Sequence, residues 1–181
     1  MSDTNTLQLP ESGLAEDILA QFLVQAQQEE DVKGTEAVKT EGMAQFHLVT
    51  FSLGREEYGV EIASVQEIIR ATGITPVPGA PRHVSGVINV RGKILPVIDL
   101  RKRFGLAEAD ADEAQRIIVV EMGAKRLGML VDSVSQVLKF SSAIVEDIPE
   151  EAMSLDDNYI KGIGKLDNRL IIIIDLKQSL L

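Results

Sequence analysis

The sequence contains one pattern of residues twice. Residues 46–69 align with residues 115–138 at a constant offset of 69 positions, and the two segments share two glycines, a serine and a valine. Residues 84–104 align with residues 160–180 at an offset of 76 without a gap, and they share a glycine and an Asp-Leu pair. The offsets differ because the connector within the second copy is longer. A duplicated unit of this length predicts two similar lobes.

Both copies consist of short apolar, β-branched runs separated by glycine turns, which predicts strands. We expect strands at residues 46–53, 58–62, 84–90, 93–100, 117–121, 126–131, 160–166 and 170–176. Many short strands with glycine turns are typical of small barrels or sandwiches, in which a closed sheet leaves few bare edges. The predicted fold class is therefore mainly β.

One segment within the first copy has a helical signature instead. Ser64 is followed three residues later by Glu67, which fits a capping box, and predicts a short helix with Val65 and Ile68 on its apolar side. The counterpart that begins at Ser133 fits the same pattern, although the residues after it fit a strand equally well.

The chain divides into three predicted segments. Residues 1–45 form an acidic extension, residues 46–105 a first β-barrel subdomain and residues 106–181 a second one, and exchange of a strand between the subdomains stays open. Within the extension, apolar side chains recur at helical spacing, which predicts a short amphipathic helix over residues 14–28. Two interpretations of this helix remain, a marginal helix in a mobile tail or a helix that docks on a partner or on the barrels.

The acidic charge of the chain is concentrated in this extension. The formal net charge of the whole chain is −10, and residues 1–45 hold nine acidic side chains and two lysines. The remainder is nearly balanced, with nineteen acids and sixteen bases. Because phosphate binding needs clustered lysine and arginine, this distribution argues against nucleic acid as the main partner.

The sequence lacks the motifs of common catalytic and metal sites. It has no cysteine and two histidines, which argues against a thiolate metal site, a histidine-based zinc site or a catalytic triad. Residues 86–94 resemble a P-loop only superficially, because Ile94 stands where serine or threonine must bind Mg²⁺. We therefore predict no cofactor, no metal and no enzymatic activity. Without a signal sequence or a long apolar run, we expect a cytoplasmic protein that does not insert into the membrane.

The turn between residues 84–90 and 93–100 carries an unusual residue. A two-residue hairpin turn favours residues that accept positive φ, and the second copy places Asp167 and Asn168 there. The first copy has Arg91 followed by Gly92. An arginine departs from good turn chemistry, which indicates a role outside the turn itself. The alternative is a solvated tip in which Gly92 alone adopts the special conformation.

Five segments occur in a specific order along the chain. They are YGVEI at 58–62, VQEI at 65–68, GVINVRG at 86–92, PVIDLR at 96–101 and GMLVDSV at 128–134. In this order they resemble the CheW family of bacterial chemotaxis coupling proteins. The resemblance covers residues 46–180, and the hairpin that contains GVINVRG and PVIDLR is its most specific part.

The resemblance implies a fold and a function. The implied fold is two SH3-like five-stranded β-barrels related by a pseudo-twofold, with short helices and an N-terminal extension. The implied function is a non-catalytic scaffold that joins the cytoplasmic tips of methyl-accepting chemotaxis receptors to the regulatory domain of the histidine kinase CheA. Such a protein is recruited to receptor arrays at the membrane.

The resemblance also implies which residues meet these partners. Arg91 in the hairpin turn and Glu67 in the VQEI segment are the implied interface residues. We expect an apolar groove between the barrels to receive the receptor tip, with Val65 and Ile68 lining it. Further hairpin residues are expected beside the same surfaces: Gly86, Asn89, Val90 and Gly92.

Two other classes of function stay open. Small barrels also bind single-stranded nucleic acid, but this requires exposed aromatic side chains for base stacking. The chain has two tyrosines and five phenylalanines, mostly in predicted strands. An enzyme with an unrecognised site would require a pocket with convergent titratable groups.

Overall fold

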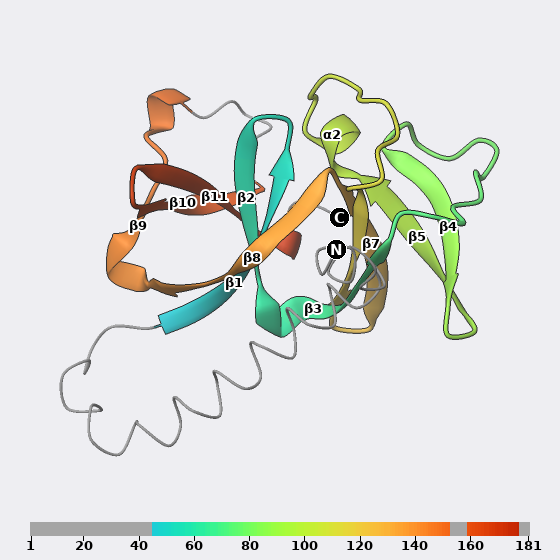
Figure 1. Ribbon diagram of the computed structural model, residues 1–181, viewed down its shortest axis with the longest axis horizontal. Helices are drawn as coiled ribbons and strands as arrows, with labels where there is room; N and C mark the ends of the chain where they lie inside the picture. Colours follow the sequence, from blue (N-terminus) through green and yellow to red (C-terminus); the bar gives the residue numbers. More distant parts are fainter. Residues whose placement is uncertain (1–44, 153–158, 178–181) are drawn as a thin grey trace, which may run out of the picture.

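The computed structural model describes residues 45–152 and 159–177, which form two β-sheets (Figure 1). The strands are β1 Gln45–Leu53, β2 Glu56–Glu61, β3 Val65–Arg70, β4 Val84–Val90, β5 Lys93–Asp99, β6 Arg116–Met122, β7 Lys125–Val131, β8 Ser133–Ser141, β9 Val145–Glu146, β10 Ile160–Leu166 and β11 Arg169–Ile174. The short helices are η2 Ile62–Ser64, α2 Leu100–Arg103, η3 Ser142–Ile144 and η4 Glu150–Ala152. The amphipathic helix expected at residues 14–28 lies outside the described residues.

The two sheets confirm the predicted pair of SH3-like barrels. One sheet has six strands in the order β8-β1-β2-β11-β10-β9, and the other has five in the order β3-β6-β7-β5-β4. We call them the six-stranded and the five-stranded barrel. The repeat is visible in the elements, because β1 and β2 correspond to β6 and β7, and β4 and β5 correspond to β10 and β11.

Each barrel combines strands from both copies of the repeat. The hairpin β1–β2 belongs to the six-stranded barrel with the later strands, whereas β6–β7 belongs to the five-stranded barrel with the earlier ones. The joins are equivalent, because β2 pairs with β11 and β5 pairs with β7, both in parallel. Two strands are thus exchanged in each direction, and the sheets do not separate between residues 105 and 106.

The segment after η2 is a strand, so the predicted short helix is wrong. β3 pairs antiparallel with β6, and Ile68 lies opposite Ile118. Three of the six residues of β3 are β-branched, which suits a pleated, half-buried strand better than a helix. Pairing with β6 therefore outweighs the local capping-box signal. The counterpart is likewise a strand, β8.

The two barrels share one core. The largest buried cluster joins side chains from both, among them Phe51 of β1 and Met129 of β7. Four stacked aromatic rings extend from this cluster, with centroid separations of 5.9, 5.7 and 4.2 Å along Phe51, Tyr58, Phe104 and Tyr159. Smaller clusters fill the interior of each barrel. Because the largest buried apolar cluster contains side chains from both barrels, the barrels are expected to unfold as one unit.

Candidate functional site

The hairpin turn between β4 and β5 holds Arg91 in a strained conformation. Arg91 has a φ of 50° and Gly92 a φ of 84°, so both turn residues adopt positive φ, and the alternative in which Gly92 alone does so is wrong. The Gly92 N–H donates to Asn89 Oδ1 at 3.0 Å, which supports the turn. A left-handed conformation costs a residue with a Cβ about 1–2 kcal/mol. Residues held in such conformations are common at functional sites.

Arg91 and Glu67, predicted as interface residues, lie together. Arg91 Nη2 is 3.5 Å from Glu67 Oε2, although β4 and β3 are at opposite ends of the sheet order. The pair therefore bridges the two edges that meet when the barrel closes. The Arg91 side chain is 81% exposed and that of Glu67 is 26% exposed. Around them lies a hollow of about 300 Å³, which we call the Arg91–Glu67 hollow, lined by Gln66, Glu67, Val90, Arg91, Lys93, Leu95, Val119 and Arg126.

Gly86 is buried against the backbone of the connector that precedes β4. Its φ is 149°, and a Cβ built there would lie 2.2 Å from the Thr75 carbonyl oxygen. Thr75 and Val87 exchange two backbone hydrogen bonds of 2.9 Å. The absence of a side chain at Gly86 thus lets the proline-containing connector lie directly against β4.

Val65 and Ile68, the residues predicted to line a groove, differ in how deeply they are buried. Ile68 is 4% exposed and belongs to the cluster that joins the barrels, so its side chain is not available to a partner in this structure. Val65 is partly buried and packs against the same cluster. Both side chains therefore face the junction of the barrels, but the accessible surface there belongs to other residues.

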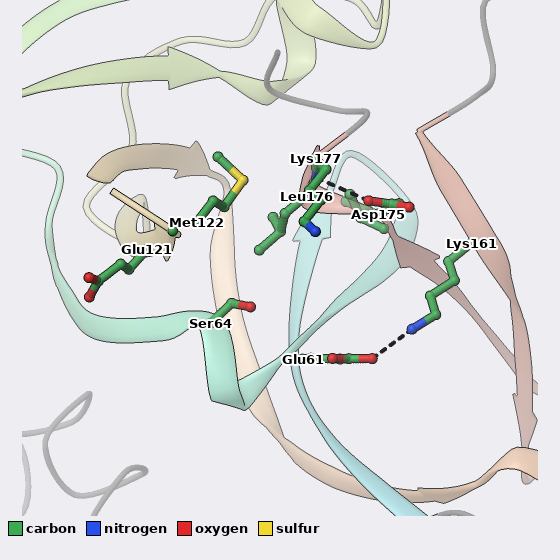
Figure 2. A pocket seen from close by; sticks show the side chains of 10 residues that line it. Glu61, Ser64, Glu121, Met122, Lys161, Asp175, Leu176 and Lys177 are labelled. Carbon is green, nitrogen blue, oxygen red and sulfur yellow. Dashed lines mark hydrogen bonds and ion pairs between the residues drawn. The ribbon is translucent and has the colours of Figure 1, made fainter. Parts of the chain in front are cut away.

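A groove of about 420 Å³ opens at this junction (Figure 2). It draws side chains from both barrels, with apolar groups beside charges of both signs, and Lys161 Nζ lies 2.7 Å from Glu61 Oε1. We call it the junction groove. Its lining residues are Glu61, Ser64, Glu121, Met122, Gly123, Lys161, Ile174, Asp175, Leu176 and Lys177.

The junction groove and the Arg91–Glu67 hollow are linked by polar contacts. Glu121 lines the groove, and its Oε2 accepts a hydrogen bond of 2.6 Å from Gln66 Nε2. Arg126 Nε lies 3.5 Å from the same oxygen. Gln66 and Arg126 both line the hollow, so the two recesses form one continuous surface across β3, β6 and β7.

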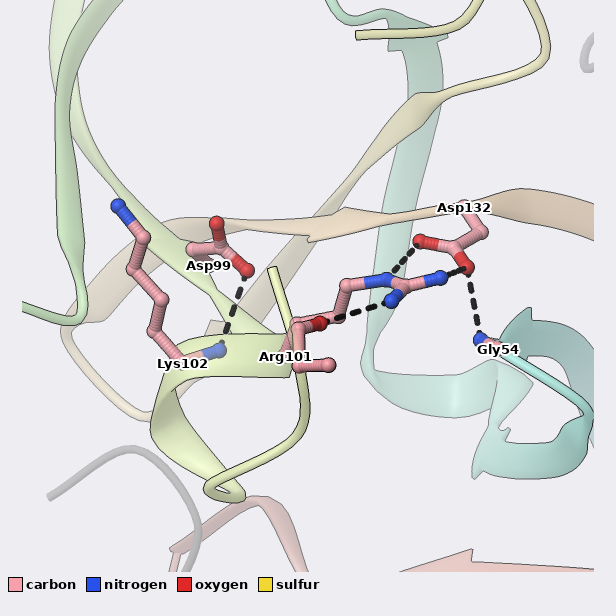
Figure 3. A network of polar contacts seen from close by, with 6 residues as sticks. Gly54, Asp99, Arg101, Lys102 and Asp132 are labelled. Carbon is pink, nitrogen blue, oxygen red and sulfur yellow. Dashed lines mark hydrogen bonds and ion pairs between the residues drawn. The ribbon is translucent and has the colours of Figure 1, made fainter. Parts of the chain in front are cut away.

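At the repeat-equivalent position the junction is closed by an ion pair (Figure 3). Arg101 Nε donates to Asp132 Oδ1 at 2.7 Å, and a second contact joins Arg101 Nη2 to Asp132 Oδ2. The Gly54 N–H donates to Asp132 Oδ2 at 2.7 Å. The Arg101 hydrogen bond holds the pKa of Asp132 below its usual range. Because Arg101 belongs to α2 and Gly54 to the β1–β2 turn, this Arg101–Asp132 clamp ties one barrel to the other.

The groove end of the junction lacks this clamp. The offset of 76 aligns Lys177 of the second copy with Arg101 of the first, and the offset of 69 aligns Ala63 of the first copy with Asp132 of the second. Gly123, the equivalent of Gly54, lines the groove. A lysine cannot form the bidentate pair, and an alanine offers no acceptor. Two residue differences between the copies thus account for one closed and one open end.

Most of the chain matches one family of known proteins. Residues 47–180 match the family model of the CheW-like domain. The chain belongs to the CheW family. Chemotaxis protein CheW of Klebsiella aerogenes is 38% identical over 130 residues, covering 72% of this chain and 78% of that protein. The probable chemotaxis protein CheW of Rhizobium etli is also 38% identical, over 141 residues covering 78% and 91%.

A solved CheW structure has the same fold. The scaffolding protein TtCheW from Thermoanaerobacter tengcongensis superposes with a TM-score of 0.68 at 39% identity, covering 74% of this chain and 86% of that one. The CheW family and this scaffolding relative give the chain the role of a chemotaxis scaffold. The resemblance seen in the hairpin motifs is therefore confirmed.

Other kinds of site find little support in the described residues of this CheW-family chain. Residues 45–152 and 159–177 contain no group of three or more histidine, cysteine, aspartate or glutamate side chains that could hold a metal ion. No helix among them is long and apolar enough to cross a membrane. Every aromatic residue in this part is buried or partly buried, which leaves no exposed ring for base stacking: Phe46, Phe51, Tyr58, Phe104, Phe140 and Tyr159.

Sequence reasoning missed most of the junction groove and all of the clamp. It singled out Glu67 and Arg91, which the structure brings together. It did not identify Met122, Lys161 or Lys177. One signal was available, because the two offsets that define the repeat align Arg101 with Lys177 and Asp132 with Ala63. That Arg101 reaches Asp132 follows only from the exchange of strands.

Proposed function

We propose that this chain couples methyl-accepting chemotaxis receptors to the histidine kinase CheA by binding alone, within receptor arrays on the cytoplasmic side of the membrane. The observation that carries the proposal is the Arg91–Glu67 pair, in which an arginine occupies a strained turn position and remains 81% exposed. An exposed ion pair adds at most about 1 kcal/mol to stability, so folding alone does not account for this residue. The family supports receptors and CheA as the partners.

The junction groove suits the tip of a receptor's helical hairpin. Amphipathic helices bind by placing their apolar face in a groove, and here the partly buried Met122 provides the accessible apolar lining, beside the buried Ile174 and Leu176. The charges around them, such as Glu61 and Lys161, would fix the register of the helix more than its affinity. The regulatory barrel of CheA would dock on a separate barrel face.

Coupling then requires that the partners bind two arrangements of the scaffold unequally. A ligand shifts an equilibrium only by its differential affinity for the two states. The junction between the barrels is the natural place for such a difference, because it is clamped at one end and open at the other. Small movements of the barrels about the Arg101–Asp132 clamp would alter the width of the groove.

Replacing Arg91 with asparagine should separate stability from binding. Asparagine accepts positive φ, as Asn168 does at 66° in the equivalent turn, so Arg91→Asn should raise the free energy of unfolding by about 0.5–1 kcal/mol. Loss of the ion pair with Glu67 should weaken receptor or kinase binding about tenfold. Urea unfolding and calorimetric titration with each partner measure the two effects.

An arginine at the equivalent turn position of the other barrel is the matched control. The offset of 76 aligns Arg91 with Asp167, whose φ is 47°, so Asp167→Arg should lower stability by a similar amount and leave binding unchanged. If Arg91→Asn binds both partners as tightly as the unmodified chain, Arg91 has no role at the interface.

Building a second clamp should close the junction groove. The double variant Ala63→Asp, Lys177→Arg recreates the residue pair of the closed end, and we expect binding of a receptor signalling-domain fragment to fall at least about tenfold. Kinase binding on another face should persist. The single variant Lys177→Arg keeps the charge and should retain receptor binding, so full affinity in the double variant would place the receptor site elsewhere.

A further inference from the structure

We propose that the acidic extension, through residues 14–28, docks in the junction groove of its own chain and competes there with the receptor tip. The extension would act as a built-in competitor that lowers the affinity of the scaffold for receptors. The competition rests on the proposed function, because it assumes that the receptor tip uses this groove. The docking itself does not.

The extension has the chemistry that the groove receives. Leu14, Ile18 and Phe22 recur at four-residue spacing, so in the predicted helix they would share one apolar face, and Glu16 and Asp17 would lie outside that face. The groove offers the partly buried Met122 beside the buried Ile174 and Leu176. Its charged lining is mixed, with the ammonium groups of Lys161 and Lys177 among the carboxylates of Glu61, Glu121 and Asp175. An acidic amphipathic helix would therefore meet apolar groups with its apolar face and lysines with its charged flank.

Only the two lysines of the groove favour an acidic partner, because the groove lining also holds three acids. Residues 1–45 carry nine acidic side chains and two lysines, whereas the rest of the chain is close to balance. Lys161 is already paired with Glu61 at 2.7 Å, so acidic groups of the extension would join or replace Glu61 as its partner. Charge of this kind also makes the contact sensitive to salt.

The groove is close to the point where the extension enters the barrel. β1 begins at Gln45, and Leu48, three residues later, pairs with Glu61 on the groove rim. Three strand residues span about 10 Å. Residues 29–44, which separate the helical segment from β1, can reach about 50 Å when extended. Treated as a random chain of that length, their root-mean-square span is about 22 Å. Both spans exceed the distance of about 10 Å from the start of β1 to the groove rim.

This short tether makes a weak contact effective. A short linker gives an intramolecular ligand an effective concentration on the order of millimolar. A helix–groove contact with a dissociation constant of about 0.1 mM in trans would then fill the groove about 90% of the time. The apparent affinity for a competing receptor tip would fall about tenfold, because it is reduced by the fraction of open grooves.

A single tryptophan tests the docking in the full chain. The sequence contains no tryptophan, so Phe22→Trp gives one emission signal. We expect a blue-shifted emission, protected from acrylamide and independent of protein concentration. Adding Lys177→Glu should return the emission to that of solvent-exposed tryptophan, whereas Lys93→Glu in the Arg91–Glu67 hollow should not. The proposal is overturned if the Phe22→Trp chain alone shows solvent-like emission. It is also overturned if the blue shift persists after Lys177→Glu is added, or if it disappears on dilution.

Receptor binding separates this proposal from the proposed function. Ile18→Asp places a charge on the apolar face of the extension, and we expect it to tighten binding of a receptor signalling-domain fragment about tenfold. Equal affinity for the variant and the unmodified chain overturns the competition and leaves receptor coupling intact. If neither chain binds the fragment, receptor coupling and the competition fail together, while the tryptophan signal still decides the docking.

Discussion

Gly86→Ala is expected to lower the free energy of unfolding by about 3–4 kcal/mol. The added Cβ would lie 2.2 Å from the Thr75 carbonyl oxygen, 2.7 Å from its carbonyl carbon and 3.0 Å from the Pro76 Cα, and none of these backbone atoms can rotate away. Relief requires the connector to move off β4, which breaks the paired 2.9 Å hydrogen bonds between Thr75 and Val87. Urea unfolding followed by circular dichroism measures the loss.

A glycine within the connector itself separates the clash from backbone strain. Gly79 also has a positive φ, 78°, but an added Cβ there meets nothing within 4 Å. Gly79→Ala should therefore cost only the left-handed conformation, about 1 kcal/mol. Equal losses for the two variants would show that contact with Thr75 does not determine the requirement for glycine at position 86.

Asp132→Ala is expected to lower the free energy of unfolding by about 2–3 kcal/mol. The substitution removes a bidentate, charge-assisted pair whose side chains are 18% and 22% exposed, and it leaves Arg101 without its counter-charge. It also removes the acceptor of the Gly54 N–H. The exposed Arg82–Glu108 pair is a suitable control, because Glu108→Ala should cost less than about 1 kcal/mol. A cost for Asp132→Ala as small as that of Glu108→Ala would refute the role of the clamp.

The contribution of Asp132 should also depend on pH with a definite sign. Its pKa in the folded protein is lowered, first by the Arg101 hydrogen bond, so the unfolded chain binds this proton more readily. The clamp therefore stabilises the protein fully above the ordinary carboxyl pKa of about 4, and this stabilisation is lost as the pH falls through the lower folded value. The stability difference between the unmodified chain and Asp132→Ala should be constant from neutral pH to about pH 5 and should shrink below pH 4. A difference that persists unchanged at pH 3 would contradict this linkage.

The fold was accessible from sequence wherever the signal is local or repeated. The period of the strands and the two constant offsets predicted β-barrels in two copies, and turn chemistry singled out Arg91. The β3 segment was mispredicted because a capping box is a local signal, whereas pairing with β6 is a long-range contact that one sequence does not display. Ile68 was expected to line a groove, but it packs in the shared core, and the depth of its burial depends on how closely two barrels pack.

The candidate site was only partly accessible for a related reason. Glu67 and Arg91 lie on strands at opposite ends of one sheet order, so their contact requires the barrel to close. The clamp and the groove depend on residues from different copies meeting across the exchanged hairpins. Alignment of the copies identifies equivalent positions such as Arg101 and Lys177, but it does not show what lies opposite each of them.

The exchanged hairpins explain how the two ends of the junction can differ. Two separate half-chains that swapped β1–β2 and β6–β7 would form an intertwined homodimer with the present topology. In such a homodimer every substitution appears twice, so both ends would carry the arginine–aspartate pair or neither would. In a single polypeptide that constraint is absent, because each residue of the two ends is encoded separately. A chain that contains both copies can therefore hold its two barrels together at one end of their junction and stay accessible to a partner at the other, which a symmetric homodimer cannot do.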